Sequence, residues 1–187
     1  MINYVLASQS PRRKELMKKI SSSFLVDPSN VEENIPEGLT PVQVVKYLAE
    51  IKGKEVKSRH QDDLVISADT IVVFNDQIIG KPVNKEDAKR ILQILSDNTH
   101  EVYTAYHIFY QDQEIDNAVR SVVAFNRLED SLIDKYIESG SPLDKAGAYG
   151  IQDNKKFHII KKLTGSKDNV IGFPVKEIKK SIRAILD

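Results

Sequence analysis

The sequence predicts a single mixed α/β domain spanning residues 1–187. The first observation is length: 187 residues is close to the roughly 150 of one domain, and no repeat, low-complexity linker or break in composition divides the chain. The second is a run rich in β-branched residues over 64–74, which is typical of a strand buried on both faces. The third is the alternation of such runs with amphipathic helical patterns.

Strands are predicted wherever short apolar or β-rich runs occur. In chain order these runs cover about 2–7, 24–26, 64–74, 101–110, 115–126, 157–163 and 169–172. We expect Asp69 to interrupt the 64–74 strand, because a carboxylate inside an apolar strand is costly unless it is paired, hydrogen-bonded or bound to a metal. Asn75 and Asp76 are then expected to turn the chain.

Helices are predicted where apolar residues recur at helical spacing. They cover about 11–19, 40–57, 84–98, 131–138 and 175–185. Ser10 before Pro11 has the form of an N-cap followed by proline at the first helical position. Thr40 and Gln43 have the spacing of a capping box, and Asn84 can cap the third helix.

Composition excludes several classes of protein. Cysteine is absent, which rules out a disulfide scaffold and thiolate-ligated zinc or iron–sulfur sites. The 27 basic and 27 acidic residues cancel, so no global field attracts DNA or a membrane. The chain has no stretch of roughly 18 apolar residues and no basic segment ahead of an apolar run at its N-terminus. We therefore expect a soluble cytoplasmic protein with no membrane or nucleic-acid partner.

Common nucleotide and metal motifs are also missing. There is no Gly-x-x-x-x-Gly-Lys-Ser/Thr motif, and no Gly-x-Gly-x-x-Gly follows a predicted strand. The four histidines lack the spacing of metal ligands and are expected to be surface or packing residues: His60, His100, His107 and His158.

The segment from Ser8 to Lys14 is a candidate phosphate site. Residues 10–20 carry five basic side chains and one acidic one. A helix N-terminus offers free N–H groups to an anion, and the guanidinium fork of arginine matches phosphate oxygens in pairs. Cations are unfavourable in a first helical turn, so Arg12 and Arg13 there favour a bound polyanion. The alternative is a capped surface helix with a solvated basic face.

Asp69 is a candidate general base or ligand of a hard cation. The alternative is an N-cap or turn aspartate. An acidic loop between the second strand and second helix contains four carboxylates and no base: Asp27, Glu32, Glu33 and Glu37. Such a loop is commonly just solvated, but one of the four could complete a magnesium site with Asp69, since Mg²⁺ is held by one or two carboxylates plus substrate phosphates.

The segment from Asp144 to Gln152 is a candidate for close approach to a ligand. Its two glycines allow the backbone to come near another molecule. Lys145 can meet a phosphate, while Gln152 offers the donor and acceptor that reading a base requires. The alternative is a glycine-containing turn before a strand. Lys81 is a similar loop lysine, and Lys52 on a predicted helix is expected from pattern alone to be solvated.

Four blocks of the sequence, in this order, resemble the Maf family of nucleoside triphosphate pyrophosphatases. The blocks are Leu6-Ala-Ser-Gln-Ser-Pro-Arg-Arg-Lys-Glu-Leu16, Ser67-Ala-Asp-Thr-Ile-Val-Val73, Gly80-Lys-Pro82 and Pro142-Leu-Asp-Lys-Ala-Gly-Ala-Tyr-Gly-Ile-Gln152, and the resemblance extends to Asn169-Val-Ile-Gly-Phe-Pro174. It implies a long mixed β-sheet flanked by helices around a central cleft, related to inosine triphosphatases, and a homodimer. It also implies a house-cleaning activity, the metal-dependent hydrolysis of non-standard or surplus nucleoside triphosphates to the monophosphate and pyrophosphate.

The resemblance also implies roles for individual residues. The family's catalytic carboxylate falls on Asp69, which with Glu33 would hold Mg²⁺ or Mn²⁺ while water attacks the α-phosphate. Its phosphate-binding groups fall on Ser8, Arg12, Arg13, Lys52, Lys81 and Lys145. Its positions for substrate choice fall on Arg12, Thr70 and Gln152. The Ala-Tyr-Gly-Ile-Gln form resembles the branch that prefers dTTP and UTP.

Two positions depart from the family pattern: Asp153 stands where glycine is common, and Lys167 stands where Gly-Ser-Tyr would be usual. Two other functions remain open at this point. One is a nucleotide-binding regulatory protein with negligible turnover. The other is a DNA-binding protein that grips a minor groove with Ser-Pro-Arg-Arg-Lys, against which the zero net charge counts.

Overall fold

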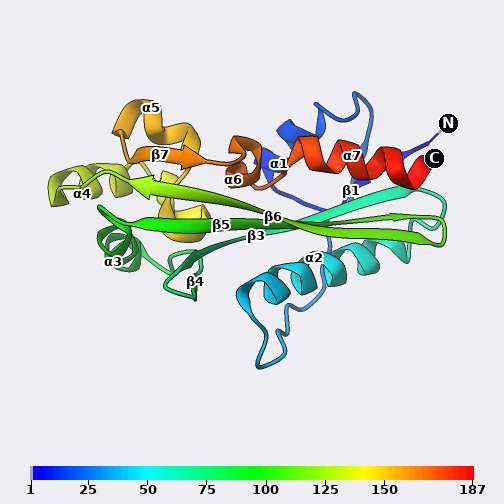
Figure 1. Cartoon of the computed structure of the whole chain (residues 1–187), viewed down its shortest axis with the longest axis horizontal. Coiled ribbons are helices and arrows are strands. Elements are labelled where there is room, and N and C mark those ends of the chain that lie inside the picture. The colour runs from blue at the N-terminus through cyan, green and yellow to red at the C-terminus, as the bar shows by residue number, and fades with distance from the viewer. Residues whose placement is uncertain (1) are drawn as a thin grey trace. The chain divides into compact units, whose positions relative to one another are not determined.

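The computed structural model describes residues 2–187, which form both strands and helices (Figure 1). The strands are β1 (Tyr4–Leu6), β2 (Leu25–Val26), β3 (Leu64–Phe74), β4 (Gln77–Ile79), β5 (Thr99–Tyr110), β6 (Gln113–Phe125) and β7 (Ile160–Thr164). The α-helices are α1 (Pro11–Met17), α2 (Pro41–Lys57), α3 (Lys85–Leu95), α4 (Asp130–Glu138), α5 (Asn154–Phe157), α6 (Lys167–Ile171) and α7 (Val175–Leu186). Three 3₁₀ turns follow α4: η1 (Ser141–Asp144), η2 (Ala146–Ala148) and η3 (Ile151–Asp153).

The strands of residues 2–187 form one mixed sheet of seven strands. Its order is β2-β1-β3-β5-β6-β7, and β4 pairs with β3 beside this path. Strand β1 runs parallel to both β2 and β3, whereas β4 is antiparallel to β3 and β7 is antiparallel to β6. The predicted class, a mixed β-sheet flanked by helices, is confirmed.

The chain divides into two compact units, and the sheet has strands in both. Unit 1 contains the described residues up to Thr70, together with Thr104–Val119 and Gly172–Asp187. Unit 2 contains Ile71–Tyr103 and Arg120–Ile171. Strands β3, β5 and β6 each begin in one unit and end in the other. The single domain that the sequence predicts stays a prediction.

In unit 1, helices cover both faces of the strands. On one face, the hydroxyl of Ser67 in β3 donates to the carbonyl of Ala49 in α2 at 2.6 Å. On the other face, Tyr106 of β5 shares a 2.8 Å hydrogen bond with Ser181 of α7. Figure 1 shows α2 on one side of the strands, with α1 and α7 on the other.

Strand β3 continues through Asp69, so the interruption predicted there is wrong. Side chains alternate along a strand, which places Asp69 on the same face as Ser67 and Thr70 on the opposite face. The strand tolerates the carboxylate because Asp69 is half-buried rather than fully buried and has a cationic partner in Lys52.

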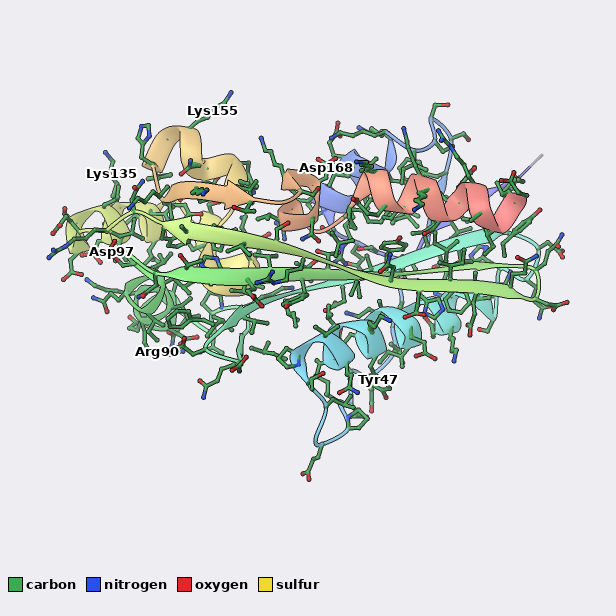
Figure 2. The ribbon with its side chains drawn as sticks, in the orientation of Figure 1. Tyr47, Arg90, Asp97, Lys135, Lys155 and Asp168 are labelled. Carbon is green, nitrogen blue, oxygen red and sulfur yellow. The ribbon has the colours of Figure 1, made fainter. Side chains whose placement is uncertain are left out.

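The core of unit 2 lies between α3, α4 and the strands. It is built from apolar side chains such as Leu95, Phe125 and Ile133, each almost fully buried. The outer faces of α3 and α4 carry exposed charged residues, among them Arg90 and Lys135 (Figure 2). This division between apolar and charged faces is what the helical spacing of the sequence predicts.

The predicted helix starts are confirmed, and two strand predictions need correction. Ser10, Thr40 and Asn84 cap α1, α2 and α3 through their side chains, and the Thr40 capping box is complete. The segment 169–172, predicted as a strand, lies mostly in α6, since Ser166 accepts from the Asn169 N–H at 3.2 Å. Strand β7 starts at Ile160 because residues 154–157 form α5.

Strand β4 was not predicted, although the turn before it was. Asn75 and Asp76 both have positive φ, 50° and 60°, as in the tight turns that join hairpin strands. Three residues are too few to show an alternating pattern, so the pairing with β3 comes from the turn rather than from the sequence of β4. No helix within residues 2–187 is both long enough and apolar enough to span a membrane.

His100 is a buried packing residue of unit 2, as predicted for the histidines. It is 1% exposed, and its Nε2 lies 2.8 Å from the hydroxyl of Tyr149. The ring also packs edge-on against Phe125. Burial lowers the pKa of His100 from 6.5 to about 4, because a charged imidazolium there would lose its hydration.

This burial predicts a loss of stability in mild acid. Between about pH 6.5 and 4 the unfolded chain protonates His100 while the folded chain does not, so the unfolded state binds more protons and stability falls as pH decreases, by up to about 3 kcal/mol. Urea unfolding from pH 7 to 4.5 should show a shallower decline for His100→Gln than for wild type. His158→Asn, which changes an exposed histidine, is the control. Equal slopes for wild type and His100→Gln would contradict the prediction.

Candidate active site

The turn between β1 and α1 forms the first part of the site, in unit 1. Ser8 is buried, and its hydroxyl accepts a hydrogen bond from the backbone N–H of Ser10 at 3.2 Å. Ser10 caps α1 by accepting from the backbone N–H of Arg13. The strand–turn–helix arrangement predicted for this segment is therefore confirmed, and it leaves Arg12 and Arg13 in the first turn of the helix.

Arg13 is held by three different segments of unit 1. Its guanidinium donates to the carbonyl of Gly172 at 2.9 Å, to the hydroxyl of Thr70 at 3.2 Å and to the hydroxyl of Ser8 at 3.3 Å. The Thr70 hydroxyl in turn lies 2.9 Å from that of the buried Thr104. The guanidinium is fixed in one orientation, and it is not the freely solvated group of a basic surface helix.

The charges around Arg13 come from the same site. Burial lowers the pKa of Arg13, and the carboxylate of Asp69 opposes this shift. The positive charge of Arg12 lowers the pKa further, whereas Glu33 raises it. Two arginines and two carboxylates therefore interact electrostatically within unit 1.

Lys52 joins the two carboxylates that the sequence singled out. It projects from α2, and its ammonium lies 2.6 Å from Asp69 Oδ1 and 2.9 Å from Glu33 Oε1. The Lys52 and Asp69 side chains are 17% and 14% exposed, so much of this ion pair is shielded from water. The helical pattern predicts that Lys52 is solvated, and this prediction is wrong.

Of the four acids in the loop before α2, Glu33 is the one that contacts Lys52, the partner of Asp69. Asp27 instead pairs with Arg59 and His60, and the hydrogen bond from Arg59 lowers the pKa of Asp27. Glu32 accepts from Asn34, and Glu37 is exposed. Charge alone could not show which of the four acids belongs to the site. Only the folding of the loop places Glu33, and not the other three, against Lys52 of α2.

The carboxylate pair suits an open site, in which a hard divalent cation also binds water and substrate, better than a metal centre closed by protein ligands. Within residues 2–187 no group of three or more histidine and carboxylate side chains could hold a metal ion. Glu33 and Asp69, however, both direct an oxygen at one position, which the Lys52 ammonium takes. Mg²⁺ is commonly held by one or two carboxylates, its other ligands being water and substrate phosphates.

The other three predicted residues lie in unit 2, on two segments that are bonded to each other. Lys145 is buried between η1 and η2, where its ammonium donates to the carbonyl and hydroxyl of Ser141 and lies 2.6 Å from Asp144. The Gly147 N–H donates to the carbonyl of Gly80 at 3.0 Å. This bond ties the loop of the exposed Lys81 to the loop of Lys145.

The loop around Gly147 explains why a glycine is needed there. Gly147 has φ of +70°, and a Cβ added to it would lie 2.9 Å from a methyl group of Val72. The next residue, Ala148, is fully buried and also has a positive φ, +56°, although it carries a Cβ. The segment is thus three short 3₁₀ turns in an unusual conformation, rather than the single glycine-containing turn before a strand that was the alternative.

Gln152 ends this segment as an exposed side chain. A Cβ built on Gly150 would lie 2.5 Å from the Gln152 amide nitrogen, so Gln152 folds over the Gly150 backbone. Asp153 accepts hydrogen bonds from Tyr136 and Ser141. Tyr136 and Ser141 were not predicted from the sequence, in which the departure from the family pattern at Asp153 was the only signal of this contact.

Solved structures of known proteins share this fold. A Ham1 protein from Staphylococcus aureus matches with a TM-score of 0.54 and 14% identity, over 98% of this chain and 99% of that one. A HAM1 protein from Coxiella burnetii matches with a TM-score of 0.53 and 14% identity, over 98% of this chain and 100% of that one. At this level of identity the similarity shows the fold alone.

A family model described as Maf-like protein matches residues 3–185. The chain belongs to the Maf-like protein family. It is 39% identical to a protein of Halalkalibacterium halodurans, over 97% of this chain and 93% of the relative, and 41% identical to one of Agathobacter rectalis, over 99% and 98%. A protein of Bacillus anthracis is 40% identical over 98% of this chain and 95% of the relative. All three relatives bear the name dTTP/UTP pyrophosphatase.

Replacing Gly172 tests how closely this residue packs against the Thr70 hydroxyl that Arg13 contacts. Gly172→Ala should destabilise the protein, because φ is +114° there and the new Cβ would lie 3.0 Å from the Thr70 hydroxyl, which Arg13 and Thr104 keep in place. Gly38→Ala is the matched control, since φ is +81° and no atom lies within 4 Å of its Cβ. We expect urea unfolding to show a loss for Gly172→Ala about 1 kcal/mol larger than for the control. Equal losses would mean that the Thr70 contact contributes nothing.

Proposed function

We propose that this protein hydrolyses nucleoside triphosphates, preferentially dTTP and UTP, to the monophosphate and pyrophosphate. The observation that carries the proposal is the cluster in unit 1, where Lys52 bridges Glu33 and Asp69, two carboxylates whose charges also act on the hydrogen-bonded Arg13. Relatives named dTTP/UTP pyrophosphatase, about 40% identical over almost the whole chain, support the reaction and the choice of pyrimidine.

A divalent cation is part of this proposal. Held by Asp69 and Glu33, Mg²⁺ or Mn²⁺ would neutralise the triphosphate and make the α-phosphorus more open to attack. Lys52 would then pair with phosphate oxygens in place of the two carboxylates, because its ammonium is a mobile point charge on a flexible stem.

Asp69 is the proposed general base. A half-buried carboxylate can accept a proton from water, and attack by that water at the α-phosphorus releases pyrophosphate. Cationic and hydroxyl groups would bind the phosphates: Ser8, Arg12, Arg13, Lys52, Lys81 and Lys145. Arg13 suits this role because its orientation is set before substrate binds, so little entropy is lost on binding.

The base would be selected by Arg12, Thr70 and Gln152. The Gln152 amide is exposed and carries both a donor and an acceptor. The Thr70 hydroxyl already accepts from Arg13. A contribution of Thr70 to selection would therefore pass in part through the placement of Arg13. The expected homodimer rests on the family resemblance, and the expected cytoplasmic location rests on the sequence pattern; both remain predictions.

The reaction is tested by separating products. Purified protein is incubated with Mg²⁺ and a panel of nucleoside triphosphates, modified bases included. We expect pyrophosphate and the monophosphate, formed fastest from dTTP or UTP. Another favoured base would overturn the roles of Thr70 and Gln152, and orthophosphate alone would mean cleavage at a different phosphorus. Tight nucleotide binding without turnover in Mg²⁺ or Mn²⁺ would support a regulatory binding protein instead.

Asp69→Asn tests the general base. The amide keeps the shape of the side chain but cannot accept the proton, so turnover should fall by about 10²–10⁴-fold. The melting temperature should be compared with that of wild type to exclude misfolding, and the exposed Asp62→Asn serves as a control that should retain full activity. Turnover of Asp69→Asn within threefold of wild type would remove Asp69 from this role.

A further inference from the structure

A hydrogen-bonded cluster in unit 2 joins two residues that the proposed function assigns to the substrate. At its centre, Asp153 Oδ2 accepts from the hydroxyl of Tyr136 and from that of Ser141, both at 2.7 Å. Tyr136 is 1% exposed and belongs to α4, where its ring lies 4.7 Å from that of Phe157. The carboxylate is therefore bonded to a rigid part of the core.

Tyr136 also fixes the other end of the turn that carries Gln152. Its hydroxyl accepts from the Gly150 N–H at 3.0 Å while it donates to Asp153. Burial raises the pKa of Tyr136, and the hydrogen bond to Asp153 raises it further, so the phenol keeps its proton and remains a donor. Gly150 and Asp153, on either side of Gln152, are bonded to the same oxygen atom.

Ser141 extends the cluster to Lys145. The ammonium of Lys145 donates to both the carbonyl and the hydroxyl oxygen of Ser141, the latter at 3.2 Å. The Ser141 hydroxyl uses its own proton to bond Asp153. One carboxylate thus determines where the hydroxyl of Ser141 points, and that hydroxyl helps to place the lysine.

We propose that Asp153 is a positioning residue for substrate selection, which fixes Lys145 and Gln152 relative to each other through Ser141 and Tyr136. The inference rests on the proposed function, because it takes Lys145 as a phosphate ligand and Gln152 as a reader of the base. It adds to that function a residue that does not itself touch the nucleotide.

The close packing around Gly150 makes this positioning effective. A Cβ built on Gly150 would lie 2.5 Å from the Gln152 amide nitrogen and 2.9 Å from Asp153 Oδ2. The two side chains therefore lie over the same small patch of backbone. Removing the carboxylate leaves the buried Tyr136 hydroxyl without its acceptor and frees space into which Gln152 can move.

Substitutions at Asp153 and Tyr136 test the proposal in the full-length protein. We would measure kcat and KM for dTTP, UTP and CTP, and the Kd of non-hydrolysable dTTP and CTP analogues by calorimetry. Asp153→Ala should raise the Kd and KM for dTTP by about tenfold, the effect of one lost hydrogen bond to a charged group, and reduce the preference for dTTP over CTP. The kcat should change by less than about threefold, since no reacting atom is involved.

Related variants separate positioning from stability. Asp153→Asn should recover most of the selectivity, because an amide oxygen can accept both hydrogen bonds. Tyr136→Phe should reproduce the loss, and combining it with Asp153→Ala should add little, as expected for residues acting through one contact. Glu138→Gln, an exposed carboxylate-to-amide change at the end of α4, should behave as wild type.

The outcomes distinguish this inference from the proposed function. A lower melting temperature for Asp153→Ala with unchanged Kd values and an unchanged dTTP/CTP ratio would overturn the inference, as would equal losses for every nucleotide. A wild-type protein that releases no pyrophosphate would contradict the proposed function, while the Kd ratios would still decide the role of Asp153. Failure of the wild type to bind any nucleotide analogue would overturn both.

Discussion

The site in unit 1 depends on the ion pair between Lys52 and Asp69. An aspartate within an apolar strand would oppose folding if its charge were unpaired, and Lys52 on α2 supplies the opposite charge at 2.6 Å. Because the same ammonium also contacts Glu33, the pair draws the acidic loop onto the helix. A cluster of this kind is costly to bury and contributes little stability of its own, which is consistent with retention for chemistry rather than for folding.

Arg13 shows how the fold prepares a binding group in advance. Its guanidinium is bonded to the β1–α1 turn, to β3 and to the segment before α7, three parts of unit 1 that are far apart in the sequence. A side chain fixed in this way loses little freedom when an anion arrives. The rigid arginine and the flexible Lys52 therefore suit different tasks, the first to orient phosphate groups and the second to exchange one negative partner for another.

In unit 2 the candidate residues are positioned by short turns rather than by long helices or strands. The three 3₁₀ turns after α4 have little regular backbone pairing, and side chains replace it. Asp153, Ser141 and Tyr136 bond to one another, and the Gly147 N–H joins the loop of Lys81. This segment therefore depends on a few side-chain contacts, which makes its geometry sensitive to single substitutions.

The sequence by itself determined most of the secondary structure and the identity of the candidate residues. The caps at Ser10, Thr40 and Asn84 and the apolar periodicities are local signals, so the helices and long strands could be predicted from neighbouring residues. Tertiary structure decided which charges meet. The family resemblance singles out Glu33 among the four acids, but the pairing of Lys52 with Asp69 leaves no trace at short range. Such contacts form only when segments distant in the chain pack together, as for Tyr136 and Asp153, whose hydrogen bond exists because α4 and the turn at Gly150 meet in the core.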